Sequence, residues 1–343
     1  MEIVELTAQD EGDWDVYVRA SGNATPYHLL AWREVMAGTY GYRPHYLLAK
    51  RSGAVHGVLP LFEVRSRLIG DGLMSLPGGV CADTDEAGQA LVEAARESTR
   101  TLGLDYLNLR DVPTPLGGAT QTINHHCCFV REIPEAYAEL TRTVPANMRR
   151  QVRQGLTQGA RIEAGQAGLE DFYQAFATFT RDMGTPVFGL DFLKRIVRAL
   201  PDRWMVVCIR ASGRVIGGGF QLLLGDTIWG LWGGAIHRYL PLRPNHLLIW
   251  GCLEYGQQHG FRRLNLGRSR VGSGQYDFKR QWGVAVQPLY QQFYRSRNAE
   301  GGMRIDGADN ARSSILLVRL WRHLPVSAAR WLGPKIRRHI PFG

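Results

Sequence analysis

A lysine directly after a phenylalanine stands out in the segment GSGQYDFKRQWG, residues 272–283. A fixed cation that faces a ligand stabilises a developing oxyanion, or holds a phosphate as a point charge. The two glycines before Tyr276 allow the backbone to approach a ligand closely. If the segment is extended, Tyr276 and Phe278 share one face and Lys279 lies on the other. Spacing alone favours an exposed surface lysine, because most lysines are solvated.

Further basic residues lie near this segment, where they are candidates for anion binding. Arg268 and Arg270 follow the predicted strand RLNLG and precede the lysine motif. Loops at strand ends commonly carry binding residues. Earlier in the chain, Arg243 and Asn245 precede the apolar run HLLIWGCLEYG, for which Asn245 is the predicted N-cap. A helix start of this kind offers backbone N–H groups to an anion.

A third basic group lies in the segment 136–163, which is predicted to be helical and to break at Pro145. The helix is predicted to restart with Asn147 as N-cap and to end at a glycine. Arg149, Arg150 and Arg153 then lie close together on its surface without an acidic neighbour. Guanidinium groups suit phosphate and carboxylate, so the arginines form either an anion-binding patch or a solvated helix face.

Two stretches of the chain repeat each other. YLLAKRSGAVHGVLPLF, residues 46–62, matches VVCIRASGRVIGGGFQL, residues 206–222, at an offset of 160. Both read as strand, Ser-Gly turn and strand, which predicts a β-hairpin. Thr25-Pro26 recurs at the same offset, and GLDYLNL recurs as GFRRLNL at an offset of 157. Each half is therefore predicted to contain two helices, three strands, a helix and a strand, as in an α/β unit with a mixed sheet.

The repeat sets the predicted domain organisation. We predict a first unit over 1–112, a connecting helical segment over 113–159, a second unit over 160–295 and a basic tail over 296–343. The second unit contains the lysine motif. Two units agree with a chain of 343 residues, which exceeds the size of an ordinary single core.

Composition indicates a folded protein of a reducing compartment. Hydrophobic residues make up 45% of the chain, and the five cysteines are odd in number and scattered. The first residues carry no apolar signal segment, and no stretch approaches the length of a membrane span, so we expect a cytoplasmic location. The run HHCC at 125–128 does not favour a metal site, because adjacent residues cannot easily face one ion.

The C-terminal segment concentrates the net charge of +10. It has no acidic residue after Asp309 and carries seven basic residues: Arg312, Arg319, Arg322, Arg330, Lys335, Arg337 and Arg338. Tryptophans and leucines alternate with these cations. The pattern predicts an amphipathic helix that either packs on the body of the protein or binds an anionic membrane surface through 312–343. The same charges would also attract RNA phosphates.

Taken together, the two acetyltransferase-like units and the motifs NMRRQVRQGLTQGARIE, GRVIGGGFQLLLGDTIWGLWGG and GSGQYDFKRQWG resemble the FemAB/FemX family of tandem GNAT proteins. More narrowly, they resemble the FemAB-like proteins associated with exosortase, PEP-CTERM and exopolysaccharide gene sets. The resemblance implies an acyl- or aminoacyl-transferase that acts on an amine or hydroxyl of a cell-envelope or exopolysaccharide precursor. It also places Phe278 and Lys279, with Tyr276 beside them, at the transfer site. By the same resemblance, Trp32 and Arg33 border the acceptor groove.

The resemblance leaves the donor open between aminoacyl-tRNA and acyl-CoA. Ordinary acetyltransferases hold the CoA pyrophosphate on a glycine-rich turn that opens a helix. Here Arg238 is followed by YLPLRPNHL, and no glycine occurs before Gly251, so standard CoA binding is weakened. Two alternatives remain: a CoA-dependent N- or O-acyltransferase of a lipid-linked sugar, and a non-catalytic pair that binds a glycan precursor and is tethered to a membrane. No cofactor is firmly implied.

Overall fold

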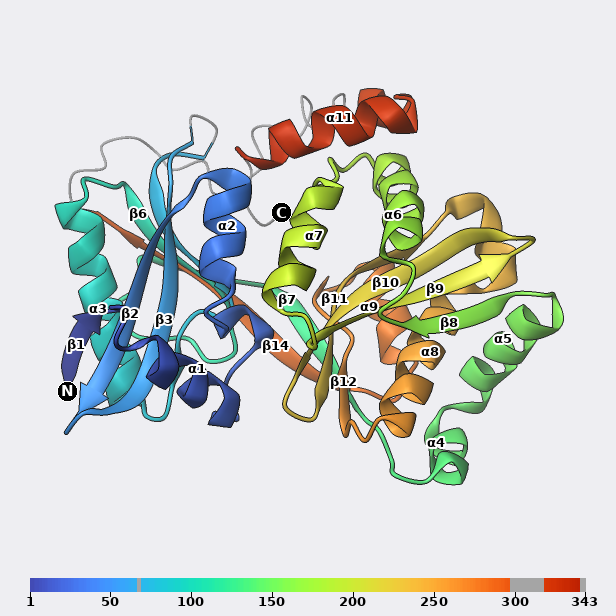
Figure 1. The fold of residues 1–343 in the computed structure, drawn as a ribbon, viewed down its shortest axis with the longest axis horizontal. Helices are drawn as coiled ribbons and strands as arrows, with labels where there is room; N and C mark the ends of the chain where they lie inside the picture. The colour runs from blue at the N-terminus through green and yellow to red at the C-terminus, as the bar shows by residue number, and fades with distance from the viewer. Residues whose placement is uncertain (67–68, 297–317, 340–343) are drawn as a thin grey trace. The chain divides into compact units, whose positions relative to one another are not determined.

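The computed structural model describes residues 1–66, 69–296 and 318–339, and the chain divides into two compact units (Figure 1). The first unit contains Met1–His126 and the described parts of Pro288–Gly307 and Arg337–Gly343. The second contains Cys127–Gln287 and the described part of Ala308–Ile336. These limits differ from the predicted boundaries at 112 and 159, because the helices of the predicted connecting segment belong to the second unit.

The first unit begins with a strand and ends with the parallel strand of its sheet. Its elements are β1 Glu2–Glu5, α1 Glu11–Ala20, the 3-10 helix Pro26–His28, α2 Trp32–Tyr40, β2 Arg43–Arg51, β3 Ala54–Val64, β4 Gly72–Pro77, β5 Cys81–Ala82, α3 Asp85–Thr101 and β6 Tyr106–Val112. The sheet order is β1-β2-β3-β4-β6, with β4 and β6 parallel and the other neighbours antiparallel. Strand β1 is not among the predicted elements.

The second unit repeats this order. Its elements are α4 Tyr137–Thr143, α5 Ala146–Thr157, β8 Arg161–Gly165, α6 Leu169–Met183, α7 Leu190–Ala199, β9 Trp204–Ala211, β10 Arg214–Leu224, β11 Thr227–Ala235, the 3-10 helix His237–Leu242, α8 Pro244–Gln258, β12 Arg263–Asn265, β13 Ser269–Arg270, α9 Gly274–Arg280 and α11 Val326–Arg337. The sheet order is β8-β9-β10-β11-β12, again with only its last pair parallel. The predicted α/β class with two similar mixed-sheet units is confirmed.

The predicted hairpins are present in both units with the same turn. Ser52 and Gly53 have φ angles of 50° and 83°, and Ser212 and Gly213 have φ angles of 48° and 73°. Two central residues with positive φ match the type I′ turn that suits the twist of a hairpin. Each hairpin also shows a register shift shortly after the turn, between β2 and β3 and between β9 and β10.

Each sheet is covered by helices on both faces, because side chains alternate along its strands. In the first unit Leu47 of β2 joins the core beneath α3, whereas Tyr46 faces the other side and contacts Trp14 of α1 with ring centroids 5.0 Å apart. In the second unit Val207 of β9 joins the core with α8. On the opposite face Phe220 of β10 packs against Phe172 of α6.

Two long strands pass from one unit to the other. Strand β7 covers Gln121–Glu132 and pairs with β12 in the second unit, and β14 covers Ala285–Arg295 and pairs with β6 in the first. Each strand follows one repeat in the chain and extends the sheet of the other. The exchange explains why the unit limits fall within these strands, after residues 126 and 287.

Within the described ranges, no helix has the length and apolar character needed to cross a membrane. Part of the basic tail, including Arg312, lies outside the described residues. Its described part, residues 318–339, includes α11, which packs on the second unit. There Gly333 lies against the backbone of Val187, where a Cβ would come within 2.4 Å of the Val187 oxygen.

Candidate functional site

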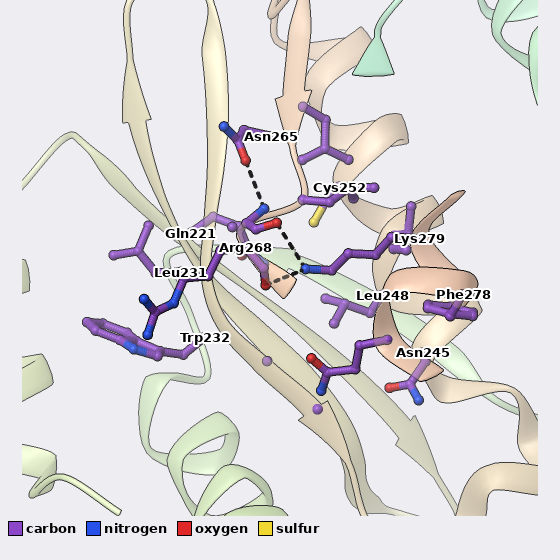
Figure 2. A pocket seen from close by; sticks show the side chains of 18 of the residues that line it. Gln221, Leu231, Trp232, Asn245, Leu248, Cys252, Asn265, Arg268, Phe278 and Lys279 are labelled. Carbon is purple, nitrogen blue, oxygen red and sulfur yellow. Dashed lines mark hydrogen bonds between the residues drawn. The ribbon is translucent and has the colours of Figure 1, made fainter. Parts of the chain in front are cut away.

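A pocket of about 240 Å³ opens in the second unit beside β11, the loop after β12, α8 and α9 (Figure 2). Its position follows from the pairing of the two parallel strands. β11 and β12 pair only at Thr227–Trp229 with Arg263–Asn265, because β12 ends there. Beyond that point the rest of β11 and residues 266–268 line the pocket on either side. A short strand next to a long one therefore produces the space.

Gly267 fixes the shape of the loop after β12. Its φ of +72° lies in the left-handed region, and its N–H donates to the Asn265 side-chain oxygen over 2.8 Å. A Cβ at this position would come within 2.4 Å of the Gly230 carbonyl oxygen on β11. Only glycine allows the loop to pass this close to the strand. The loop then presents the carbonyl oxygens of Gly267 and Arg268 to the lysine.

The lysine motif is helical. Residues Gly274–Arg280 form α9, and the Ser273 side chain accepts the N–H of Tyr276 as its N-cap. The extended segment considered in the sequence analysis is therefore wrong, because Ser273 starts a helix after the glycine turn. Phe278 and Lys279 line the pocket, whereas Tyr276 packs against Phe129 with ring centroids 5.6 Å apart.

Lys279 extends from α9 across the pocket to the loop after β12 (Figure 2). Its Nζ donates to the carbonyl oxygens of Gly267 and Arg268, each over 3.0 Å, and lies 5.3 Å from the centroid of the Phe129 ring. Burial lowers the pKa of this amine to about 8. The lysine is thus a held cation at neutral pH, with two of its three N–H bonds used by the protein.

Aromatic residues anchor α9 on the start of α8. The Phe278 ring meets the His246 ring at 4.9 Å in an edge-on contact, and Trp282 is fully buried behind both. Burial lowers the pKa of His246 to about 4, so the ring is neutral and packs as an aromatic group. After the helix, the Gly283 carbonyl accepts from the Arg131 guanidinium over 2.7 Å. These contacts hold Lys279 in place.

The pocket combines an apolar wall with few polar groups. Phe179, Leu231, Trp232 and Leu248 are among its apolar members. The polar side chains are listed here: Gln221, Asn245, Asn265, Arg268, Gln275 and Lys279. Among the described residues that line the pocket there is no aspartate or glutamate. The electrostatic field of its side chains is therefore positive, which suits an oxyanion or a phosphate and opposes a cationic group.

Gln221 is an interior member of this lining, with only 3% of its surface exposed. In the orientation that satisfies both ends of its amide, its nitrogen donates to the carbonyl oxygens of Gly219 and Met205. The sequence did not predict the roles of Gln221, Trp232 and Asn265. It also did not predict the backbone carbonyl oxygens that accept hydrogen bonds from Lys279. The only sequence signal for them was their position in or directly after the predicted strands that became β10, β11 and β12.

The predicted anion-binding residues divide into two groups. Arg268 and Asn245 line the pocket, but Arg270, Arg243 and the three arginines of α5 do not. The Arg243 guanidinium donates to the Gln154 side chain over 3.2 Å, and that of Arg149 donates to the Val144 carbonyl over 3.1 Å. Arg150 and Arg153 are exposed on the same helix.

Two predicted N-caps are wrong. Helix α5 begins at Ala146 after Pro145, so Asn147 lies inside its first turn. Helix α8 begins at Pro244 after Arg243, which takes a φ of +58°. Asn245 therefore lies inside the helix, where its side chain lines the pocket. Pro244 occupies the first helical position of α8, where its fixed φ suits the helix. Pro145 instead precedes α5 as its cap residue.

The start of α8 is poorly suited to a pyrophosphate. Pro244 has no N–H, and the N–H groups of His246 and Leu247 donate to the Arg243 carbonyl. An anion at this helix start would therefore find fewer backbone donors than a glycine-rich turn offers.

Trp32 and Arg33 belong to the first unit. Trp32 is 1% exposed and its indole N–H donates to the Pro26 carbonyl over 2.9 Å. Arg33 pairs with Glu11 over 2.6 Å. Trp32 is thus a core residue of its unit, whereas the Arg33 side chain is partly accessible.

Comparison with known proteins agrees with this architecture. Residues 142–280 match the family model described as an acetyltransferase (GNAT) domain, and this range contains the pocket and Lys279. No curated protein matches the chain in sequence.

Several solved structures share the fold over most of the chain. A crystal structure of FemX has a TM-score of 0.70 and 16% identity, covering 86% of this chain and 98% of that one. A tandem GNAT protein from the clavulanic acid biosynthesis pathway has a TM-score of 0.56 and 12% identity, covering 86% and 98%. The C-terminal domain of a putative lysylphosphatidylglycerol synthetase from Agrobacterium fabrum has a TM-score of 0.56 and 12% identity, covering 85% and 93%. These similarities establish a tandem GNAT-type fold.

Proposed function

We propose that the protein transfers an acyl or aminoacyl group to an amine or hydroxyl, with the acyl carbonyl bound beside Lys279. The observation that carries the proposal is the Lys279 Nζ, held at the pocket by two carbonyl oxygens at 3.0 Å. Its third N–H bond is used by no hydrogen bond among the described residues. The GNAT-type fold and the similarity to FemX and to the lysylphosphatidylglycerol synthetase domain support acyl or aminoacyl transfer.

The chemistry needs a group that stabilises negative charge. Attack by the acceptor forms a bond to the carbonyl carbon and moves electrons onto the carbonyl oxygen. Lys279 then donates its remaining N–H to that oxyanion. As the tetrahedral intermediate collapses, the bond to the leaving oxygen or sulfur breaks, and the acceptor loses a proton to the leaving group or to water. Because the Lys279 amine is already held by two carbonyl oxygens, the pocket needs little reorganisation during the reaction.

The pocket also bears on the donor. The few N–H groups at the start of α8 disfavour the usual pyrophosphate contact of CoA, so we favour an aminoacyl donor over acyl-CoA. The absence of a carboxylate among the described lining residues favours an aminoacyl group with a neutral side chain over one with a cationic side chain. For the acceptor, we propose a cell-envelope or exopolysaccharide precursor, on the basis of the resemblance to FemAB-like proteins.

The test compares Lys279→Ala with a matched surface variant. Lys194→Ala removes a partly exposed lysine of the same unit, which pairs with Glu170 and lies outside the pocket. Each protein is incubated with aminoacyl-tRNA or acyl-CoA and with an amine-bearing envelope precursor, and transfer is followed by mass spectrometry. We expect Lys279→Ala to lose about 100- to 1,000-fold in rate, the usual effect of removing an oxyanion donor.

Lys194→Ala should retain the wild-type rate and both variants the wild-type fold. Equal rates for the two variants would remove Lys279 from the transfer site. Transfer from acyl-CoA alone would select the CoA-dependent alternative.

A further inference from the structure

Helix α11 exposes a face that an ordinary surface helix does not. Trp331 is 64% exposed, and Lys335, one turn later, has its Nζ 3.4 Å above the centroid of the Trp331 ring. Ser327, one turn before Trp331, is also exposed. Residues four apart lie on one side of a helix, so these three residues form a single outer face. Figure 1 shows α11 beside the ends of α6 and α7.

The opposite face of α11 is packed on its own unit. Ala329 is 1% exposed, and Gly333 fits against the Val187 backbone. The Arg330 guanidinium lies 5.3 Å from the centroid of the Tyr173 ring on α6. The helix is therefore fixed with Trp331 pointing outward, and it cannot bury this ring by rolling without losing these contacts.

A second exposed apolar group lies on neighbouring segments of the same unit. Leu320 is 58% exposed, and Met183 at the end of α6 is 50% exposed. The neighbouring Gly184 lies against Val318, where a Cβ would come within 2.5 Å of the valine side chain. We use the name tail surface for the apolar residues Met183, Leu320 and Trp331 together with the cations Arg319, Arg322 and Lys335. Its apolar members lie on segments that contact one another, and none of them belongs to the pocket.

The charges that the C-terminal segment contributes to the tail surface have one sign. Arg319, Arg322 and Lys335 are exposed, and no acidic residue follows Asp309 in the sequence. Within the described part of the chain, none of these three cations forms an ion pair with a carboxylate. This differs from the helices of the body, where Arg96 pairs with Glu93 and Lys194 pairs with Glu170.

We propose that the tail surface binds the interface of an anionic lipid bilayer, with Trp331 and Leu320 in the headgroup region and the cations on the lipid phosphates. A tryptophan suits this boundary, because its ring is apolar while its N–H needs a polar partner. Each exposed cation near the membrane surface contributes about a fivefold gain in affinity. Charge complementarity alone would also fit RNA, but exposed Trp331, Leu320 and Met183 favour a lipid surface.

Such binding would bring the pocket to the membrane surface. Phe179 lines the pocket and lies one turn before Met183 on α6. A helical turn spans about 5.4 Å, so the last turn of α6 connects a residue of the pocket to a residue of the tail surface. An acceptor carried on a lipid would then be near the pocket when the protein is bound to the bilayer.

The test is sedimentation of the full chain with phosphatidylcholine vesicles, with and without phosphatidylglycerol. We expect binding only with the anionic lipid, and a loss at high salt. Trp331→Ala should weaken binding about tenfold or more, because it removes the inserted apolar ring. Lys335→Glu should weaken it by more than the fivefold of one lost charge.

Two exposed residues away from the tail surface serve as controls. Val16→Ala removes an apolar residue that is 66% exposed, and Arg142→Glu reverses a charge on α4. Both should bind as wild type. Brominated lipid should quench the fluorescence of wild type more than that of Trp331→Phe.

Equal binding to both vesicle types, or unchanged binding of Trp331→Ala, would overturn the proposal. RNA binding that depends on the same residues in the absence of vesicle binding would also overturn it.

Discussion

The two units share their strand order but differ where their parallel strands come to an end. In the first unit, β4 and β6 pair from Gly72–Tyr106 to Pro77–Arg110, and the Gly78 N–H still donates to the Arg110 carbonyl over 2.9 Å. In the second, the pairing of β11 and β12 stops at Trp229–Asn265. The same architecture therefore gives a bonded strand end in one unit and a pocket in the other.

Side chains fill the first unit near this position. A Cβ at Gly78 would lie 2.8 Å from the His28 ring and 2.9 Å from the Thr25 hydroxyl. The Thr25 N–H donates to His28 Nδ1 over 2.9 Å, which leaves the proton on Nε2 to be donated to the Gly79 carbonyl over 3.2 Å. The 3-10 turn that carries His28 is thus bonded into the strand end.

The corresponding segment of the second unit is arranged differently. Thr185-Pro186 repeats Thr25-Pro26, but Phe188 stands where the first unit has His28. Phe188 packs against Trp232 on β11 with ring centroids 4.8 Å apart, and Val187 supports α11. The Phe188 side chain joins an aromatic core and, unlike the His28 ring, forms no hydrogen bond to the end of a strand. One copy of the repeat thus keeps a structural strand end, while the other supplies the pocket.

Among the variants that test this difference between the units, the largest expected effect follows from displacing the loop at Gly267. Gly267→Ala places a Cβ 2.4 Å from the Gly230 oxygen at a φ of +72°. The loop must move, and the carbonyl oxygens that hold Lys279 move with it. We expect transfer to fall about 100-fold, the range for a lost oxyanion donor. Transfer rates and thermal unfolding of purified protein give the measurement.

Gly213→Ala provides the matched control for this substitution. Gly213 has a φ of +73° with nothing within 4 Å, so its variant carries the backbone strain without the clash. The two variants should lose similar stability from strain, but only Gly267→Ala should lose the rate. An active Gly267→Ala would show that this loop does not form the site.

The next effect concerns His28 and the stability of the first unit. Burial lowers the pKa of His28 to about 4, below its usual value of 6.5. The unfolded chain then binds more protons between pH 6.5 and 4, so stability falls as the pH falls through this range. The full loss of stability, reached below pH 4, is about 3 kcal/mol.

His28→Gln removes this titration, so its urea unfolding midpoint should change less between pH 7 and pH 5 than that of wild type. His246→Gln gives the comparison in the second unit, where burial also lowers the histidine pKa to about 4. An unchanged pH slope for His28→Gln would show that this ring is not held neutral by the fold.

The repeat and the succession of helices and hairpin strands along each unit could be predicted from the sequence, because they depend on local patterns. Ser52-Gly53 and Ser212-Gly213 mark hairpins by turn chemistry that acts over four residues. The exchange of β7 and β14 could not be predicted, because it depends on pairing between segments more than 130 residues apart. Strand β8 has the exposed-and-partly-buried pattern of an edge and carries little hydrophobic signal.

The candidate site could be predicted only at its motif. Lys279 and Phe278 were placed by resemblance, and Arg268 by its position after a strand. The sequence did not predict that α9 is helical, because a segment of seven residues is too short to show a helical periodicity. Gln221 and Asn265 were missed since a polar residue within a strand reads as a solvent-facing one until the fold buries it.

A third prediction concerns the rate of transfer as a function of pH. The pKa of Lys279 is lowered to about 8 from 10.5, so the cation is present below pH 8 and is lost above it. If the charged form stabilises the oxyanion, the rate of transfer should fall about tenfold for each pH unit above 8. A pH–rate profile with a non-titrating acceptor gives the measurement. Lys279→Arg should remove this descent, because arginine stays charged, and a rate that rises through pH 8 would instead assign the neutral amine to the reaction.

The smallest effect separates two arginines that follow β12. Arg268 lines the pocket, whereas Arg270 is exposed on β13 and does not. Arg268→Ala should reduce transfer by up to about tenfold, the effect of one lost charge interaction with a bound anion. Arg270→Ala should leave the rate unchanged. Both variants keep the backbone carbonyl of residue 268, which accepts a hydrogen bond from Lys279. A difference in rate therefore reports the loss of the arginine side chain. Equal losses would mean that the donor extends beyond the pocket onto β13. The site would then include β13 as well as the pocket that distinguishes the second unit from the first.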